Sequence, residues 1–136
     1  MLSAAKLHKS RRLLPLALLL FAGCGPQSNL LGVSGQVILR GVPVKTGSIQ
    51  LTSLGEGKIF ASGAEIKDGE FDIPAAKGLP PGEYLIVISA ADPTAPRMPD
   101  GAARELIPAE YNAESQKTVD LTVDGENHFV FDIVGN

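Results

Sequence analysis

From residue 33 onward, apolar and polar side chains alternate along the chain, and turn-forming residues interrupt the alternation at short intervals. The most apolar segment is LPPGEYLIVISA at residues 79–90, where two prolines and a glycine precede a run of aromatic and β-branched residues. Such a run is typical of a core strand and is too short to span a bilayer. We expect the other alternating segments to be its partners in an all-β fold.

The other segments with a two-residue period are residues 33–40, 48–54, 58–67, 71–73, 119–123 and 129–133. Asp68-Gly69 and Asp124-Gly125 each stand between two of them, and Asp-Gly favours the left-handed backbone of a two-residue hairpin. Residues 75–81 form a connection with room for one helical turn. The pattern predicts seven strands and no long helix, which is typical of a β-sandwich or β-barrel.

The first 23 residues follow the different pattern of a secretory signal. Residues 1–12 carry four basic residues and no acid, and residues 13–22 are almost wholly apolar. This apolar run is too short for a transmembrane helix. It ends in Phe21-Ala22-Gly23-Cys24, which resembles the bacterial lipobox except that Phe21 stands where leucine is usual. The alternative is an ordinary signal peptide followed by an incidental cysteine.

Cys24 is the only cysteine, so the chain forms no internal disulfide. The lipobox resemblance implies that Cys24 becomes an acylated (palmitate-bearing) N-terminus, and two or more acyl chains hold a protein durably on a membrane. Gly25 follows it in place of the aspartate that retains some lipoproteins in the inner membrane, which favours the outer membrane. We therefore expect a signal peptide at 1–23, a lipidated N-terminus and flexible leash at 24–32, and one β-sandwich domain at 33–134.

Removal of the signal makes the chain more acidic. Four of the 12 basic residues and none of the 15 acidic residues precede Cys24, which leaves a net charge of about −7. This balance argues against binding to nucleic acid or to an acidic lipid surface. About 110 residues suffice for one domain, and without tryptophan its core must consist mainly of valine, isoleucine and leucine.

Three segments in order carry a family resemblance: GQVILRGVPVKTGSIQL, the Asp-Gly hairpin with GEFDIP, and LPPGEYLIVIS. Together with RELIPAEYN and the final ENHFVFDI, they resemble the carboxypeptidase regulatory-like and transthyretin-like (prealbumin-like) domains of short planctomycete-type lipoproteins. The resemblance covers residues 33–134. It implies a seven-stranded antiparallel Greek-key β-sandwich, transthyretin-like or immunoglobulin-like, and a non-catalytic folding, adhesion or binding module.

One branch of the transthyretin-like group, the hydroxyisourate hydrolases, is catalytic and ends in Tyr-Arg-Gly-Ser, whereas this chain ends in FDIVGN. His128 is the one histidine that follows the signal. Strand alternation places it on the exposed face with Val130 and Asp132, and no spacing suggests a serine or cysteine beside it. The sequence therefore predicts neither an enzyme nor a cofactor.

The densest acidic group consists of Asp120, Asp124, Glu126 and Asp132. If the last two segments form a hairpin, Asp120 and Asp132 lie on facing strands, where calcium would need several converging oxygens. A solvated strand face with a turn aspartate explains the same residues, and the chain lacks the histidine pairs or cysteine clusters of zinc sites. We predict no metal site.

The long connection at residues 91–116 is the departure from a minimal sandwich. Its first half is rich in proline and turn residues, and its second half, RELIPAEYN, regains apolar character and is expected to lie along a sheet edge. One hypothesis is that the loop presents a recognition surface made of Arg97, Met98, Arg104 and Tyr111. The alternative is that it covers an edge strand, with Tyr111 as a lid and both arginines solvated.

Two functions fit these observations. The first is a lipid-anchored cell-envelope lipoprotein that presents a non-catalytic binding or adhesion module to a partner. A protein partner is preferred to an envelope polysaccharide because no tryptophan is available to stack on a sugar ring. The second is a structural envelope component that associates with itself through edge strands.

Overall fold

The computed structural model describes residues 29–135, and this part of the chain is all-β. It contains eight strands and two single turns of 3-10 helix. The strands are β1 (Val33–Leu39), β2 (Val42–Pro43), β3 (Thr46–Ser53), β4 (Ala61–Lys67), β5 (Glu70–Ile73), β6 (Gly82–Ser89), β7 (Thr118–Leu121) and β8 (His128–Ile133). The helical turns are η1 (Ala75–Lys77), in the connection where one was expected, and η2 (Ala109–Tyr111).

Each of the seven expected strands is present, although β4 starts later than its alternation does. The additional strand, β2, lies between the expected strands at residues 33–40 and 48–54. It pairs with the end of β1, where Leu39 faces Val42. The intervening Arg40 and Gly41 both have positive φ, so this connection is a two-residue hairpin turn.

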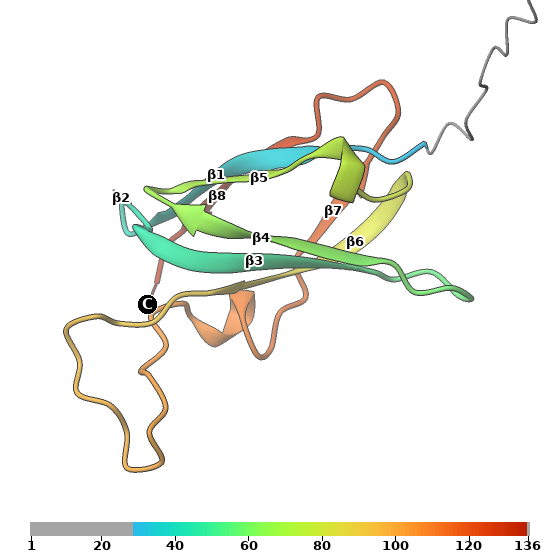
Figure 1. The fold of residues 1–136 in the computed structure, drawn as a ribbon. Coiled ribbons are helices and arrows are strands. Elements are labelled where there is room, and N and C mark those ends of the chain that lie inside the picture. Colours follow the sequence, from blue (N-terminus) through green and yellow to red (C-terminus); the bar gives the residue numbers. More distant parts are fainter. Residues whose placement is uncertain (1–28, 136) are drawn as a thin grey trace, which may run out of the picture.

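The strands form one curled sheet in the order β2-β1-β5-β4-β3-β6-β7, with β8 on the other side of β1. The curl places β1, β5 and β8 over β3 and β6 (Figure 1). All pairs are antiparallel except β1 with β8, which is parallel. The expectation of a wholly antiparallel arrangement is therefore wrong for β8.

The core lies between the two layers and consists mostly of aliphatic side chains. In β6, Tyr84, Ile86 and Ile88 point inward and are at most 1% exposed, whereas the alternate positions are only half-buried. The Tyr84 hydroxyl donates a hydrogen bond to the Pro80 carbonyl at 2.8 Å, so the buried ring keeps a partner for its polar tip. The segment that the sequence marks as central is the strand between β3 and β7.

The β4–β5 hairpin has the geometry that its sequence predicts. Asp68 and Gly69 both have positive φ, at 50° and 81°, and Lys67 pairs with Glu70 across the turn. A side chain at Gly69 would also meet the ring of Pro43 at 2.6 Å, so β2 packs closely over this turn. Gly69 is therefore suited to this position for two reasons: it tolerates a left-handed backbone, and it leaves room for Pro43.

The expected hairpin between the last two strands is wrong. β7 pairs with β6 and β8 pairs with β1, so the connection at residues 122–127 crosses from one side of the curled sheet to the other. A turn does form at residues 122–125, where the Gly125 amide donates to the Thr122 carbonyl at 3.2 Å, but the chain then continues through Asn127, which has a φ of 48°, into β8 beside β1. Asp120 therefore faces Glu83 and Asp132 faces Ile38, which separates the two aspartates proposed to share one hairpin.

The chain enters the domain at one end and carries its long loop at the other. Leu31 forms a bridge with Leu79 just before β6 begins, and β1 runs from there toward β2. The end of β6, the loop that follows it and the C-terminal end of β8 lie at the β2 end (Figure 1). Among the described residues, no helix has both the length and the apolar character needed to cross a membrane. The signal peptide and Cys24 lie outside these residues.

Candidate functional site

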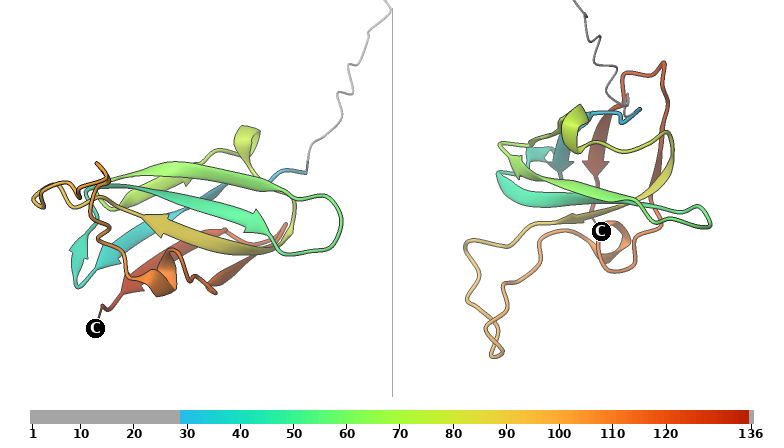
Figure 2. Two further views of the ribbon diagram at one scale, coloured as in Figure 1. Left: turned by 90° about the horizontal axis from the view of Figure 1, so that it is seen from below. Right: turned by 45° about the vertical axis from the view of Figure 1, so that its right-hand side comes forward.

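The loop after β6 is a projecting finger whose two legs are joined at the base. Ala91 forms a bridge with Glu105, and the Asp92 amide donates a hydrogen bond to the Arg104 carbonyl at 2.8 Å. Farther out, the Met98 amide donates to the Ala102 carbonyl at 2.9 Å. The finger extends away from the sheet in both views of Figure 2. It has a defined shape although it contributes no residue between 93 and 103 to the core.

The carboxylate of Glu105 holds the base of the finger to the sheet. It accepts hydrogen bonds from the Ser89 hydroxyl at 2.6 Å, from the Ala90 amide at 2.7 Å and from the Ile107 amide at 3.0 Å. The Asn112 side chain lies 3.4 Å from it and donates a shorter bond, 2.7 Å, to the Ile88 carbonyl. One side chain thus connects the end of β6, the returning leg and the segment beyond η2.

The outgoing leg begins with a turn built on Asp92. Its carboxylate accepts hydrogen bonds from the Thr94 hydroxyl at 2.7 Å and from the Thr94 amide at 2.8 Å. These bonds to the charged form, led by the hydroxyl, hold the pKa of Asp92 below its ordinary value of 3.8. The turn directs the finger away from the sheet at its first proline, Pro93.

The four residues of the recognition hypothesis do not form one patch. Arg97 and Met98 lie near the tip, where Met98 is 53% exposed and the Arg97 guanidinium donates to the Gly101 carbonyl at 3.0 Å. Arg104 is exposed on the returning leg, opposite Asp92. Tyr111 lies on η2, half-buried against the core, with the Lys117 ammonium 4.9 Å from its ring centre.

The expectation that the second half of the loop lies along a sheet edge agrees with its contacts. Ile107 is buried in the core, and the Asn112 and Ser115 side chains donate to carbonyls of β6 beyond the point where β7 pairs with it. This second half therefore covers a sheet edge, as the alternative to the recognition hypothesis states. The first half, residues 93–103, projects from the domain and covers no edge.

A groove of about 900 Å³ lies at the base of the finger, and its size is within the range of sites that hold a small molecule or a short peptide segment. The β1–β2 hairpin forms one wall and the base of the finger forms the other. The apolar residues that line it are Leu39, Val42, Pro43, Val44, Ala90, Ala91, Pro93 and Leu106. Val42 is 63% exposed and Leu106 is 36% exposed, while Lys45 and Glu65 place one charge of each sign at its border.

The groove residues were not among the sequence candidates. Val42, Pro43 and Leu106 carry no reactive group, and the segments that contain them lie far apart in the chain. The available signal was the run Val42-Pro43-Val44 between two expected strands, because connections of this kind are usually dominated by glycine, proline, asparagine, aspartate and serine. Only the fold brings this run beside the finger.

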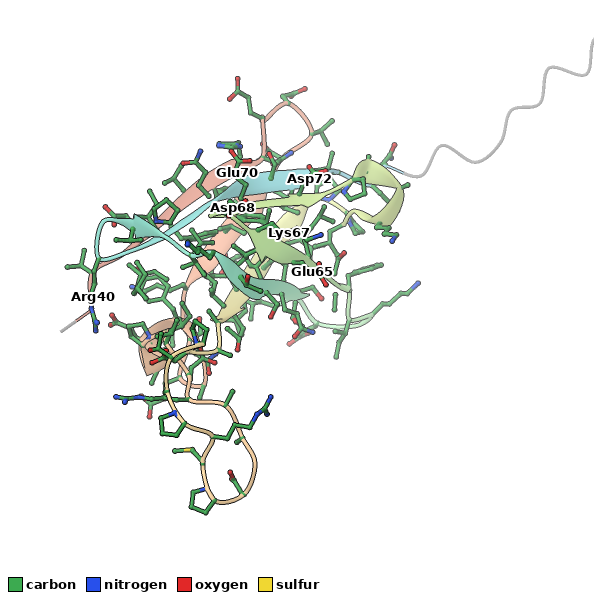
Figure 3. All side chains as sticks on the ribbon, turned by 60° about the vertical axis from the view of Figure 1, so that its left-hand side comes forward. Arg40, Glu65, Lys67, Asp68, Glu70 and Asp72 are labelled. Carbon is green, nitrogen blue, oxygen red and sulfur yellow. The ribbon has the colours of Figure 1, made fainter. Side chains whose placement is uncertain are left out.

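A second, more polar groove of about 650 Å³ lies on the outer face of β1, β4 and β5. Figure 3 shows the charged residues of β4 and β5 on this side of the domain, among them Glu65, Lys67 and Asp72. His128 is exposed as expected, but the structure brings Ser34 beside it, with 3.0 Å between the Ser34 Oγ and the His128 Nδ1. The spacing of residues in the sequence did not indicate this neighbour, because β1 and β8 are far apart in the chain.

This pair lacks the arrangement of a catalytic triad within the described residues. A triad needs an acid that orients the histidine from the side away from the serine. Asp72 faces Ser34 from β5, whereas His128 faces Ser34 from β8, so the acid and the imidazole lie on opposite sides of the hydroxyl. Residues 29–135 also contain no group of three or more histidine, cysteine, aspartate or glutamate side chains placed to hold a metal ion.

Comparison with known proteins adds no assignment: no family model, no curated protein and no solved structure matches the chain.

Proposed function

We propose that the chain is a lipid-anchored cell-envelope lipoprotein whose β domain is a non-catalytic binding module for a partner protein. The observation that carries this proposal is the placement of the groove. The described chain begins at the end of the domain marked by the Leu31–Leu79 bridge, and the finger and its groove lie at the opposite end. A tether at Cys24 would leave the groove facing away from the membrane.

The chemistry of the groove supports a protein partner. Its walls are mainly aliphatic, with a proline on each side, and it contains no aromatic side chain that could stack on a sugar ring. Apolar pockets bordered by a few polar groups are typical of peptide and small-molecule sites. An extended partner segment with apolar side chains would cover Val42 and Leu106, and its backbone could reach the polar residues of β3 at the border.

In this proposal the finger is the second part of the binding surface. Arg97 and Met98 lie at its tip, and arginine and methionine are enriched in protein interfaces. The hydrogen bonds of Glu105 and Asp92 fix the finger beside the groove before a partner binds, which lowers the ordering cost of association. Tyr111 and Arg104 then have supporting roles. Tyr111 covers the sheet edge, and Arg104 is solvent-exposed on the returning leg of the finger.

The fold is part of the same proposal. We infer that the curled sheet is a Greek-key β-sandwich of the carboxypeptidase regulatory-like or transthyretin-like kind, with β2 added to the seven strands of that pattern. Its support is the order of the sequence segments and the closure of one aliphatic core between two layers. The loops of a β-sandwich cluster at its two ends, and immunoglobulin variable domains bind through the loops of one end.

Membrane fractionation tests the anchor. The full chain should be found in the membrane fraction of the source cell, and Cys24→Ser should move it to the soluble fraction, because loss of the acyl chains removes about 0.8 kcal/mol per buried methylene. Ser28→Ala, which lies in the same segment and leaves the cysteine intact, serves as the control. Unchanged partitioning of Cys24→Ser would refute lipidation.

Crosslinking in the source cell tests the binding surface. A photoreactive residue at Leu106, in the groove, should capture a partner protein. The same residue at Val123, which is 68% exposed at the opposite end of the domain, should capture none. Equal capture from the two positions would contradict the proposal that the β2 end is the binding end.

A further inference from the structure

The outer edge of β8 is an edge of the sheet that the fold leaves open. β8 pairs with β1, through bonds such as Ser34 amide to Asn127 carbonyl and Arg40 amide to Ile133 carbonyl. In a parallel pair the backbone groups of alternate residues point to opposite sides, so those of His128, Val130 and Asp132 face away from β1. Within residues 29–135, no backbone group or strand bonds to them.

The other incompletely paired edges of the sheet carry features that oppose strand addition. β4 and β5 pair with each other only where Lys67 faces Glu70. The remaining edge of β4 contains Gly63 and the charged Glu65 and Lys67, and its Ser62 hydroxyl donates to the Lys77 carbonyl at 2.6 Å, while β5 has only four residues.

β2 has only two residues, and one of them is Pro43. β7 has four residues, and the backbone of Thr122 that follows it is bonded by the Asn127 side chain. Short strands and prolines are the usual means by which sheets avoid adding a further strand. β8 has six residues and contains no proline, lysine or glycine.

The side chains of β8 are also suited to a strand partner. On the outer face, Val130 is 56% exposed between His128 and Asp132. On the inner face, Phe129 and Phe131 are only half-buried, and their rings stack at 6.4 Å between centres. Aromatic pairs and β-branched pairs across neighbouring strands stabilise a sheet. An added strand would therefore bury apolar surface on both faces.

We propose that two copies of the chain pair antiparallel through β8, with Val130 on the two-fold axis. The sequence of the strand is complementary to itself in this register. His128 faces the partner's Asp132, Val130 faces the partner's Val130, and Phe129 faces the partner's Phe131. The three residues of each copy whose backbone groups face away from β1 form hydrogen-bonded pairs with the partner strand. Each such pair has two backbone hydrogen bonds. The interface is isologous and closes as a dimer.

Neighbouring registers lose this complementarity. A shift of two residues keeps the backbone bonds but places Val130 opposite the partner's His128 or opposite the partner's Asp132. Each shift removes the valine pair and places a polar side chain, His128 or Asp132, opposite Val130 in both copies. A shift of one residue is incompatible with the bonding, because it would pair residues whose backbone groups face β1. The register centred on Val130 is thus the one that the strand specifies.

The dimer is independent of the partner proposed for the groove. β8 lies on the far side of β1 from β5, and none of its residues lines the groove at the base of the finger. Pairing through β8 would produce one assembly with two such grooves. The test therefore uses the purified chain alone, so that its result does not depend on whether the groove binds anything.

Disulfide formation tests the contact and its register. In the full chain with Cys24→Ser, which removes the only thiol, Val130→Cys should give a covalent dimer on a non-reducing gel after mild oxidation. The two Cα atoms of a hydrogen-bonded antiparallel pair are about 5.5 Å apart, within disulfide range. Val42→Cys, exposed on β2, measures the yield from random collisions.

The register predicts a further pattern. His128→Cys alone should stay monomeric, because the two cysteines would be separated by four residues, about 13 Å along the strand, beyond disulfide reach. Mixing His128→Cys with Asp132→Cys should restore a covalent dimer. A Val130→Cys yield no higher than that of Val42→Cys, or efficient crosslinking of His128→Cys alone, would overturn the proposal.

Side-chain complementarity gives a second readout. Adding Asp132→Lys to the Val130→Cys chain should lower its dimer yield about fivefold, because two favourable cross-strand pairs are lost. Adding His128→Asp as well should restore the yield, since the aspartate introduced in each copy would then face the lysine introduced in the other. Thermal unfolding of each variant confirms that it is folded. Failure of the double change to restore the dimer in folded protein would count against this register.

Discussion

At the residue scale, Asn127 determines how the last two strands are placed. Its side-chain carbonyl accepts from the Thr122 amide at 3.0 Å, and its side-chain amide donates to the carbonyls of Thr122 and Gly125 at 3.0 and 3.3 Å. The side chain thereby satisfies backbone groups that a hairpin would have paired between strands. With its left-handed backbone, Asn127 makes the crossing from β7 to β8 compatible with a closed core.

Replacing Asn127 should destabilise the domain by an amount that depends on the backbone of the substitute. Asn127→Gly loses the side-chain bonds and should lower the free energy of unfolding by about 2 kcal/mol. Asn127→Ala should cost about 1 kcal/mol more, because alanine disfavours a positive φ. Urea unfolding of both variants measures the difference. Equal loss for the two would mean that the left-handed backbone contributes nothing.

The Asp92 turn should respond to acid. Because its carboxylate has a pKa below the ordinary value of 3.8, the turn is stabilised above that pH, and the stabilisation is lost as the pH falls through the lower, folded pKa. The amide chemical shifts of Thr94 and Ala95 should report this titration in NMR spectra. Thr94→Val removes the largest cause of the shift and should move the midpoint upward. An unchanged midpoint would contradict the assigned cause.

At the element scale, the finger is a structured part of the domain because Glu105 joins its base to β6. The carboxylate accepts hydrogen bonds from Ser89 and Ala90, where the chain leaves the sheet, and from Ile107, where it returns. The finger itself contributes no side chain between residues 93 and 103 to the core. Its position therefore depends on polar contacts at the base and not on packing along its length.

Glu105→Ala should release the finger while leaving the β-sheet folded. We expect a loss of about 1–2 kcal/mol in the free energy of unfolding, because the carboxylate is on the surface and water replaces part of its bonding. Amide hydrogen exchange should accelerate at Ala90 and Ile107, whose amides bond to Glu105. Glu110→Ala, an exposed acid on η2, is the matched control and should leave both amides protected. Retained protection in Glu105→Ala would show that other contacts fix the finger.

Local sequence patterns predicted where the strands of this fold lie better than they predicted which strands pair with each other. The β4–β5 hairpin follows from Asp68-Gly69, since two residues with positive φ suffice to close it. The same dipeptide at Asp124-Gly125 was misleading: a turn forms there, but the flanking strands do not pair with each other, and the side chain of Asn127 bonds the backbone of the six-residue connection. A network between non-adjacent residues has no two-residue signature. The parallel pairing of β8 with β1 is likewise a long-range contact that alternation alone does not encode.

The candidate site was predictable to a similar extent. Proline and turn residues marked residues 91–116 as unusual, and the apolar second half was expected to return to a sheet edge. The groove was not predictable, because Val42 and Leu106 meet only after β1, β2 and β6 have assembled. Reactive or charged residue types drew attention to Arg97 and Tyr111, which the fold places in different surroundings.

At the scale of the whole molecule, the proposed function depends on the separation of the two ends of the domain. The chain enters beside Leu79, while the groove, the finger and the C-terminal end of β8 lie at the β2 end. A membrane tether and a partner can then act on the domain without competing for the same surface. A dimer through β8 would add a third surface along the side of the sheet.

Binding of the labelled chain, starting at Gly25, to envelopes of the source cell measures directly whether the groove is the partner site. Wild type and Val123→Asp, a change at the end where the chain enters, should bind equally, and protease treatment of the envelopes should abolish binding. Leu106→Asp places a charge in the apolar groove and should weaken binding at least about tenfold, the effect of 1.4 kcal/mol. Binding of Leu106→Asp as strong as that of Val123→Asp would contradict the assignment of the groove as the partner site.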